Sequence, residues 1–148
     1  MTGTYVGVKF NNETNQAIAR YCKHNNIPNA VPTEKLHTTV IYSRKSFEFE
    51  PLGRLKAPIV AVPDSFEIWP SDKTSKRCLV LKYRCQKLVD RHNFLMKKYD
   101  ATYDYDVYKT HVTFSYDVGD MKDFPIYKGP LVIVTEYTEE LDLDWKGN

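Results

Sequence analysis

The chain has 148 residues, of which 42% are hydrophobic and 14% aromatic, which is enough apolar side chain to build one folded core. Lysine and arginine number 21 against 19 acidic residues, so the net charge of +2 is too small for a protein that coats long nucleic acid. Any polyanion that it binds should therefore be small and held at a local site. We expect a soluble protein without a signal peptide or membrane span, because no apolar run approaches roughly 20 residues. Three cysteines, an odd number, favour reduced thiols in the cytoplasm over a disulfide framework.

The first half of the chain has the pattern of a strand, a helix and further strands. β-Branched and aromatic residues at 4–10 predict a strand, and apolar residues at helical spacing predict a helix over 13–25. Composition then predicts a strand at 36–42 and one longer or two shorter strands at 59–69, where Pro63 interrupts the run. The predicted order of this half is βαββ.

The second half repeats this order. Its predicted elements are a strand at 78–83, a helix at 86–99, and strands at 110–116 and 131–137. The polar residues 70–76, rich in Ser, Lys and Asp, predict a hinge between the halves.

An internal repeat of this kind predicts one α+β domain over residues 1–148. We expect two pseudo-symmetric βαββ lobes, about 1–70 and 77–148, each with a small antiparallel sheet. The two sheets should flank a central cleft along the pseudo-two-fold axis, and such a cleft is a natural binding site.

The same hexad occurs in the third element of each half. Residues 37–42 read His-Thr-Thr-Val-Ile-Tyr and residues 111–116 read His-Val-Thr-Phe-Ser-Tyr, so both share His-x-Thr-apolar-x-Tyr. Because a strand alternates its faces, each histidine and its threonine should face the cleft, while the apolar residue and the tyrosine face the core. The cleft pairs are His37 with Thr39 and His111 with Thr113, and the core pairs are Val40 with Tyr42 and Phe114 with Tyr116.

Two facing imidazoles suit in-line displacement at phosphorus. One imidazole removes a proton from the nucleophile and the other protonates the leaving oxygen, and near neutral pH histidine can serve either role. The threonine hydroxyls can donate hydrogen bonds to the non-bridging oxygens as charge develops there. Such chemistry needs no metal and no cofactor.

Structural roles are the alternative for every histidine. His37 and His111 would then be strand histidines bonded to nearby backbone, and His24 and His92, on predicted helices, are expected to be surface or packing residues. A zinc site is disfavoured because no cysteine or carboxylate lies at ligand spacing around either motif.

The paired motifs resemble those of the 2H phosphoesterase superfamily, and the resemblance covers nearly the whole chain. That superfamily includes RNA-end phosphodiesterases, ligase-like enzymes and cyclic-nucleotide nucleases. Thr38 departs from its pattern, because the residue between His and Thr is usually apolar there. A narrower resemblance, to an anti-CBASS family of tailed phages, lies in segments 3–8, 36–45 and 136–143.

The narrower resemblance implies an enzyme that degrades the cyclic di- and trinucleotide messengers of bacterial CBASS immunity. Its partner would be a cyclic oligonucleotide, without long nucleic acid, membrane or obligate protein partner, in the cytoplasm of an infected bacterial host. The implied reaction is attack of the ribose 2′-hydroxyl on the adjacent phosphodiester, with His111 as base and His37 as acid, or with these roles reversed. The alternatives are a 2H enzyme acting on RNA or tRNA ends and a protein that binds nucleotides without cleaving them.

Five further residues are candidates for holding the substrate. Tyr5 and Trp69 are expected to stack on bases, since the resemblance implies an aromatic residue at both positions. Glu139 is a candidate for accepting a hydrogen bond from a base edge or an imidazole, and Arg44 and Lys45 for attracting phosphates. Ordinary core packing and solvated charges are the respective alternatives.

Three tyrosines alternate with aspartates just before the second motif. They are Tyr103, Tyr105 and Tyr108. The pattern predicts either a lid over the cleft or the edge of a strand.

Overall fold

The computed structural model describes residues 2–70 and 74–143. The elements follow in the order β1 (Thr2–Phe10), α1 (Asn12–His24), the 3-10 helix η1 (Thr33–Lys35), β2 (Thr38–Ser43), β3 (Gly53–Val60), β4 (Val62–Pro70), β5 (Arg77–Arg84), α2 (Gln86–Tyr99), β6 (His111–Ser115) and β7 (Val132–Asp142).

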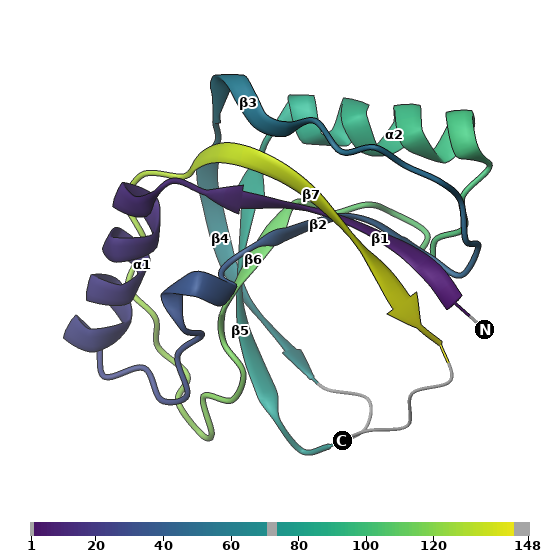
Figure 1. Ribbon diagram of the computed structural model, residues 1–148. Coiled ribbons are helices and arrows are strands. Elements are labelled where there is room, and N and C mark those ends of the chain that lie inside the picture. The colour runs from purple at the N-terminus through teal and green to yellow at the C-terminus, as the bar shows by residue number, and fades with distance from the viewer. Residues whose placement is uncertain (1, 71–73, 144–148) are drawn as a thin grey trace.

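Two antiparallel sheets form the centre of the molecule (Figure 1). The four-stranded sheet has the order β2-β1-β7-β3, and the three-stranded sheet has the order β4-β5-β6. Strand β7, from the second half of the chain, pairs along the whole of β1, whereas β4, from the first half, pairs with β5. The predicted α+β fold with two antiparallel sheets is therefore confirmed.

The predicted lobes, about 1–70 and 77–148, need correction because the two halves exchange their last strands. Only Ala61 separates β3 from β4, so the chain passes there from one sheet to the other. Consecutive antiparallel strands pair readily, and β4 accordingly pairs with the strand that follows it. The predicted hinge at 70–76 thus joins two strands of one sheet; its residues 71–73 lie outside the described part of the chain.

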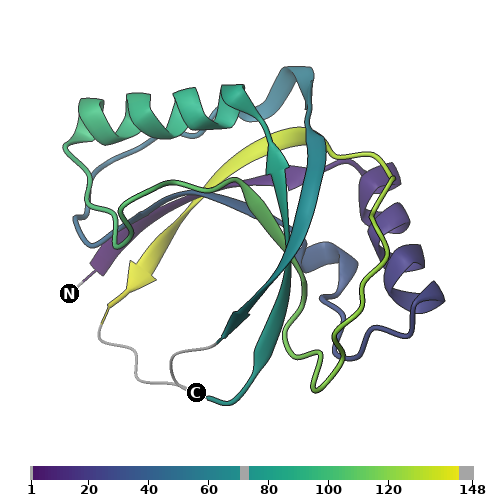
Figure 2. The same ribbon diagram turned by 180° about the vertical axis from the view of Figure 1, so that it is seen from behind.

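The helices are exchanged in the same way. Tyr21 of α1 packs against Phe66 of β4 and Phe114 of β6, with ring centroids 5.4 and 5.6 Å apart. The ring of His92 on α2 donates from Nδ1 to the carbonyl of Val40 on β2, at 2.7 Å. Figures 1 and 2 show the two helices far apart, each beside a different sheet. Because each helix covers the sheet of the other half, the halves interlock into one unit.

Local sequence explains most of the element boundaries. Helix α1 begins after Asn11, whose side chain accepts a hydrogen bond from the amide of Thr14 at 2.8 Å and so caps the helix. The first six residues of β3 were not predicted as strand. This strand lies at the edge of its sheet, contains Pro58 and carries mostly exposed side chains, so its composition differs from that of a central strand.

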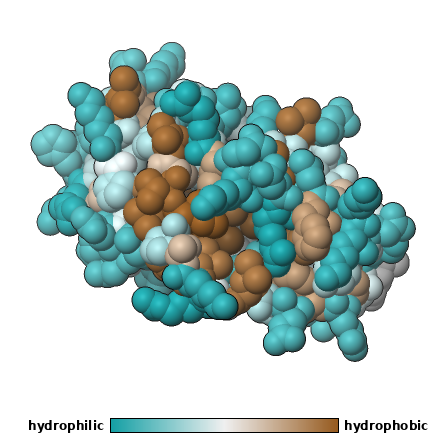
Figure 3. Space-filling view, turned by 90° about the horizontal axis from the view of Figure 1, so that it is seen from above, coloured by the Kyte–Doolittle hydropathy of each residue, from teal (hydrophilic) through white to brown (hydrophobic). Residues whose placement is uncertain are grey.

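The surface above α2 and β3 is mixed in character. Figure 3 shows apolar side chains near the middle of this face, surrounded by polar ones. Exposed apolar side chains on or next to these elements include Leu52, Val60 and Phe94. None of the three lines the cavity described below. Among the described residues, no helix combines the length and apolar character needed to cross a membrane.

Candidate active site

A cavity of about 870 Å³ is lined by side chains from both sheets. Strand β2 contributes Thr39 and Tyr42, β4 contributes Trp69 and Pro70, β6 contributes His111, and the loop before β6 contributes residues 103–107 and Lys109. The volume lies in the range of small-molecule sites. Residues from both motifs therefore meet at one cavity.

The two motif histidines are held in the same way. His37 precedes β2 and its Nδ1 lies 2.7 Å from the carbonyl oxygen of Lys35; His111 opens β6 and its Nδ1 lies 2.8 Å from the carbonyl oxygen of Lys109. A carbonyl oxygen can only accept, so Nδ1 carries the hydrogen in both rings. This leaves Nε2 of each neutral imidazole as a proton acceptor, and the same bond persists when the ring is protonated.

The surroundings of His111 favour its neutral form. Burial lowers the pKa of His111 below its ordinary value of 6.5, and the nearby charges of His37 and Lys109 lower it further. The indole of Trp69 covers the ring, with centroids 4.4 Å apart. His111 is therefore unprotonated at neutral pH and able to accept a proton.

Thr39 is fixed through both its side chain and its backbone. The hydroxyl of Tyr5 lies 3.0 Å from the hydroxyl of Thr39, and the hydroxyl of Tyr108 donates to the Thr39 carbonyl at 2.6 Å. The corresponding residue of the second motif, Thr113, is half-buried on β6 opposite Val80. Only the first of the two threonines lies among the residues that line the cavity.

The prediction that both motif tyrosines face the core is wrong. Tyr42 lines the cavity and is 42% exposed, and Tyr116 is 44% exposed. The reason is a β-bulge in each motif strand. The register of β1 with β2 shifts between Val6 and Gly7, opposite Val40, so that Thr39 and Tyr42 share the cavity although they are three residues apart.

The second motif strand has its bulge at the matching point. The register of β5 with β6 shifts between Leu79 and Val80, and the residue passed over is Phe114. Phe114 and the following Ser115 are both buried, as are Val40 and Ile41 in the first motif. The pseudo-symmetry of the motifs thus extends to an irregularity of the backbone.

Tyr5 lies beside the first motif with its ring largely enclosed. The side chain is 7% exposed, and its ring meets that of His37 edge-on at 6.2 Å. Gly7 makes room for it, because a Cβ at position 7 would lie 2.8 Å from the side chains of Tyr5 and Tyr137. Glu139 pairs with Tyr5 across β1 and β7 and is exposed. This geometry favours an orienting role for the Tyr5 hydroxyl.

Trp69 presents a ring that is oriented by an acidic neighbour. Its Nε1 donates to Glu67 at 2.8 Å, and the other carboxylate oxygen of Glu67 lies 2.7 Å from the ammonium group of Lys82. These bonds, first that from Lys82 and then that from Trp69, lower the pKa of Glu67 below its ordinary value. Lys82 pairs with His111 across β5 and β6, so the whole group adjoins the second motif.

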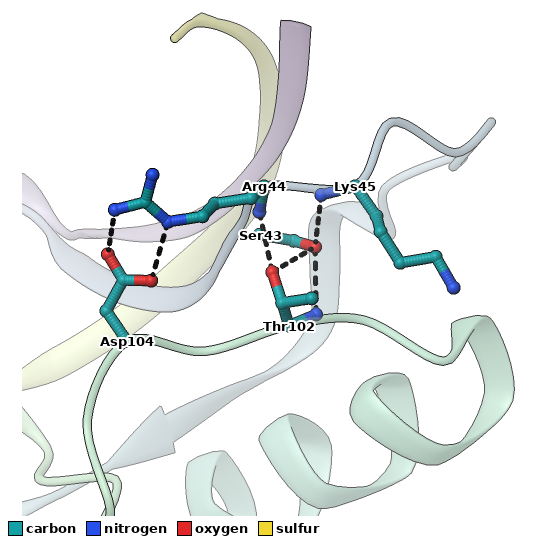
Figure 4. Close-up of polar contacts among 5 residues, drawn as sticks. All are labelled: Ser43, Arg44, Lys45, Thr102 and Asp104. Atoms are coloured by element: carbon teal, nitrogen blue, oxygen red, sulfur yellow. Dashed lines mark hydrogen bonds and ion pairs between the residues drawn. The ribbon is translucent and has the colours of Figure 1, made fainter.

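Arg44 and Lys45 are engaged by carboxylates and do not line the cavity. The guanidinium of Arg44 makes two 3.0 Å bonds to Asp104 (Figure 4). The ammonium group of Lys45 lies 2.8 Å from the carboxylate of Asp100. Figure 4 also shows Thr102 bonded to the end of β2, where its hydroxyl accepts from the Arg44 amide at 2.7 Å. The basic pair therefore fastens the loop after α2 to the first motif strand.

The loop of alternating tyrosines and aspartates forms one wall of the cavity, and it is neither helix nor strand. Tyr108 stacks on His92 with centroids 4.1 Å apart and planes 6° apart. Tyr103 meets His92 edge-on at 4.9 Å, whereas Tyr105 is 71% exposed. Burial lowers the pKa of His92, which therefore acts as a neutral packing residue.

Four cavity residues were not predicted as site residues from the sequence: Tyr42, Pro70, Val107 and Lys109. Lys109 lies two residues before His111, and Lys35 lies two residues before His37, so the repeat extends to Lys-x-His-x-Thr. This longer repeat was present in the sequence. The exposure of Tyr42 could not be found in the same way, because no local pattern predicts the bulge.

None of the three cysteines lines the cavity. Cys22, Cys78 and Cys85 are free thiols, of which the first and last are buried. Within residues 2–70 and 74–143, no three His, Cys, Asp or Glu side chains gather in a way that would hold a metal ion.

One protein family matches nearly the whole chain. The family described as "Anti-CBASS protein Acb1" matches residues 2–148. Proteins of that name from Acinetobacter phage Ac42 and Enterobacteria phage T4 are each 36% identical to this chain, over 97% of it and over 94% and 91% of their own lengths. The protein of that name from Vibrio phage KVP40 is 34% identical over 99% of this chain and 92% of its own.

Solved structures show the same fold at low sequence identity. The protein TT0787 of Thermus thermophilus aligns with a TM-score of 0.58 and 18% identity, over 93% of this chain and 84% of its own. E. coli LigT in its apo form aligns with a TM-score of 0.57 and 9% identity, over 91% of this chain and 84% of its own. These two proteins share the α+β fold of this chain, and at such low identity the likeness shows the fold alone.

Proposed function

We propose, because this chain belongs to the Anti-CBASS protein Acb1 family, that it is a metal-independent phosphodiesterase that hydrolyses cyclic di- and trinucleotide messengers of bacterial CBASS immunity. It would act in the cytoplasm of the infected host and so protect the phage. The observation that carries the proposal is the pair of imidazoles, each held by the carbonyl oxygen two residues before it. His111 lines the cavity, and His37, which is not among the lining residues, lies near enough for its charge to lower the pKa of His111.

His111 is the better general base of the pair. Its lowered pKa keeps Nε2 unprotonated at neutral pH, so it can take the proton of the ribose 2′-hydroxyl. The 2′-oxygen then forms a bond to phosphorus, and the bond from phosphorus to the 5′-oxygen breaks. His37 in its protonated form gives its Nε2 proton to that leaving oxygen. The product is linear and ends in a 2′,3′-cyclic phosphate, which the same pair can hydrolyse with their roles exchanged.

The threonines and Lys109 supply the remaining polar contacts. The hydroxyls of Thr39 and Thr113 would donate to the non-bridging phosphate oxygens as negative charge builds on them. Tyr5 bonds to Thr39 and so holds that hydroxyl in place. Lys109 lines the cavity beside His111 and offers the phosphate a positive charge that Arg44, bonded to Asp104, does not.

Trp69 and Tyr42 are the aromatic residues best placed to contact a base, because both line the cavity and neither is fully buried. Base-aromatic stacking contributes about 1–3 kcal/mol per base. Glu67 holds the indole of Trp69 at a fixed angle, which reduces the ordering needed on binding.

Trp69→Ala is expected to weaken substrate affinity by about 10-fold or more and to slow the bound-state reaction much less, because the indole holds the base and does not touch phosphorus. Titration calorimetry and single-turnover kinetics would measure the two effects separately. Trp69→Phe is the matched control and should retain most of the affinity. Loss of the folded circular dichroism spectrum in Trp69→Ala would instead assign the ring to core packing.

A panel of nucleotides tests the proposed function against its rivals. We expect rapid conversion of cyclic dinucleotides and trinucleotides to linear products identified by mass spectrometry. An RNA-end enzyme would instead open linear 2′,3′-cyclic phosphates and leave cyclic dinucleotides intact. A sequestering protein would bind cyclic nucleotides and release them unchanged, and either of these two results would refute the proposal.

A further inference from the structure

Thr38, the residue between His37 and Thr39, joins the two motif strands through its side chain. It is 1% exposed, and its hydroxyl donates to the backbone carbonyl of His111 at 2.7 Å. Strand β2 carries Thr38 and strand β6 carries His111, and these strands belong to different sheets. The bond therefore connects one catalytic motif directly to the backbone of the other.

A second hydroxyl completes this connection. Tyr83 of β5 donates to the Thr38 hydroxyl at 2.6 Å, so the donors run in one direction, from Tyr83 to Thr38 to the His111 carbonyl. Tyr83 is itself fastened to the residue before the second motif. The Tyr83 amide donates to the carbonyl of Thr110 at 3.1 Å, and the Thr110 hydroxyl donates to the carbonyl of Tyr83.

The environment keeps this chain of hydrogen bonds intact. Burial raises the pKa of Tyr83 far above its ordinary value, so the phenol keeps its proton and remains a donor. An apolar residue of the same shape at position 38 would fill the space. It would leave the Tyr83 hydroxyl without its acceptor and the His111 carbonyl without its donor, in a buried region where unpaired polar groups are costly.

The spacing of the two imidazoles depends on the spacing of these backbones. His37 is the neighbour of Thr38 in the chain, and His111 is the residue whose carbonyl Thr38 binds. Acid-base catalysis at one phosphorus atom needs both rings within reach of the same group, and a misplacement of about 1 Å can cost about 100-fold in rate. Any movement between the two sheets at this point therefore displaces the reacting groups.

We propose that Thr38 is a positioning residue that sets the distance and orientation of His37 relative to His111, with Tyr83 as its support. The inference rests on the proposed function, because it assigns Thr38 a part in that same site. It also gives a physical reason for a threonine where the superfamily usually has an apolar residue.

Steady-state kinetics and binding of Thr38→Val and Thr38→Ser with a cyclic dinucleotide test the proposal. We expect Thr38→Val to lower kcat by about 10- to 100-fold with less than about a 3-fold change in substrate Kd. Thr38→Ser restores the hydroxyl and should recover most of kcat. The matched control is Thr14→Val, which removes another buried hydroxyl, one that accepts from the Val132 amide at 3.0 Å away from the cavity.

The control separates positioning from simple loss of stability. If Thr14→Val and Thr38→Val lower Tm equally but only Thr38→Val lowers kcat, the positioning role stands. Unchanged kcat in Thr38→Val, or an equal loss of kcat in both variants, would overturn it.

A measurement independent of turnover distinguishes this inference from the proposed function. NMR titration of labelled histidines should show the pKa of His111 higher in Thr38→Val than in the native chain, because burial and His37 both hold it down. A native chain that cleaves no cyclic nucleotide would refute the proposed function. An unchanged His111 pKa in Thr38→Val would refute the positioning role, whatever the substrate.

Discussion

Replacing His37 or His111 with alanine is expected to lower turnover of a cyclic dinucleotide by at least ~100-fold while leaving the protein folded. Each substitution removes one of the two groups that transfer protons at phosphorus, and the remaining imidazole cannot serve both ends of the reaction at once. Both rings are only half-buried, and each makes one hydrogen bond to a nearby carbonyl, so little packing is lost. Turnover measured by chromatography, with circular dichroism as the folding check, gives the result.

His24→Ala is the matched control for these variants. His24 is exposed at the end of α1 and does not line the cavity of the candidate site, so its loss should leave turnover unchanged. The two motif variants should also fail to add, because the residues act as one unit, so the double variant should be about as inactive as either single one. Turnover near that of the native chain in either single variant would mean that the two-histidine mechanism is wrong.

The threonine variants should have turnover rates between that of the native chain and those of the histidine variants. Thr39→Ala and Thr113→Ala each remove one donor to the phosphate oxygens and leave both proton-transfer groups in place, so their losses should be smaller than those of the histidine variants. Thr39 is held by Tyr5, whereas Thr113 lies opposite an aliphatic residue of β5. The same chromatographic assay of turnover measures both variants.

Local patterns in the sequence predicted most of the elements and the two motifs. Apolar residues at helical spacing, which in α1 are Ala17, Ile18, Tyr21 and Cys22, placed both helices within a residue of their observed bounds. Ile18 and Cys22 are buried in the structure. The motif histidines were found because the two halves repeat the same residues at the same topological position. In both cases the signal lies within a few consecutive residues of one element.

Features that depend on long-range pairing could not be found from these patterns. The exchange of β4 and β7 between the halves depends on which strands meet in space. The exposure of Tyr42 depends on a bulge opposite Val6 and Gly7, which shifts the alternation of faces by one residue. A strand pattern alone predicted unbroken alternation and therefore the wrong face.

The ion-pair partners of the basic residues after the first motif could not be predicted from local patterns either. Arg44 and Lys45 looked able to bind phosphates, because their partners lie 60 and 55 residues further along the chain. Thr38 looked like a mere departure from the motif for a related reason. Its partners, Tyr83 and His111, lie in the other sheet, 45 and 73 residues away.

The 2′-hydroxyl beside the scissile phosphate gives the most direct test of the proposed mechanism. The nucleophile belongs to the substrate and two imidazoles supply the proton transfers, so the reaction should stop when that hydroxyl is replaced by hydrogen and should survive excess EDTA. A metal nuclease would activate a water molecule and would be indifferent to the hydroxyl. The deoxy analogue should still bind, because the base and phosphate contacts remain.

The measurement is mass spectrometry of a 3′,5′-linked cyclic dinucleotide and its 2′-deoxy analogue, each incubated with the protein in EDTA, with binding of both measured by calorimetry. We expect a linear product from the ribose form and an analogue that binds but stays cyclic. Cleavage of the deoxy analogue at a rate close to that of the ribose form, or loss of ribose cleavage in EDTA, would contradict the two-histidine mechanism.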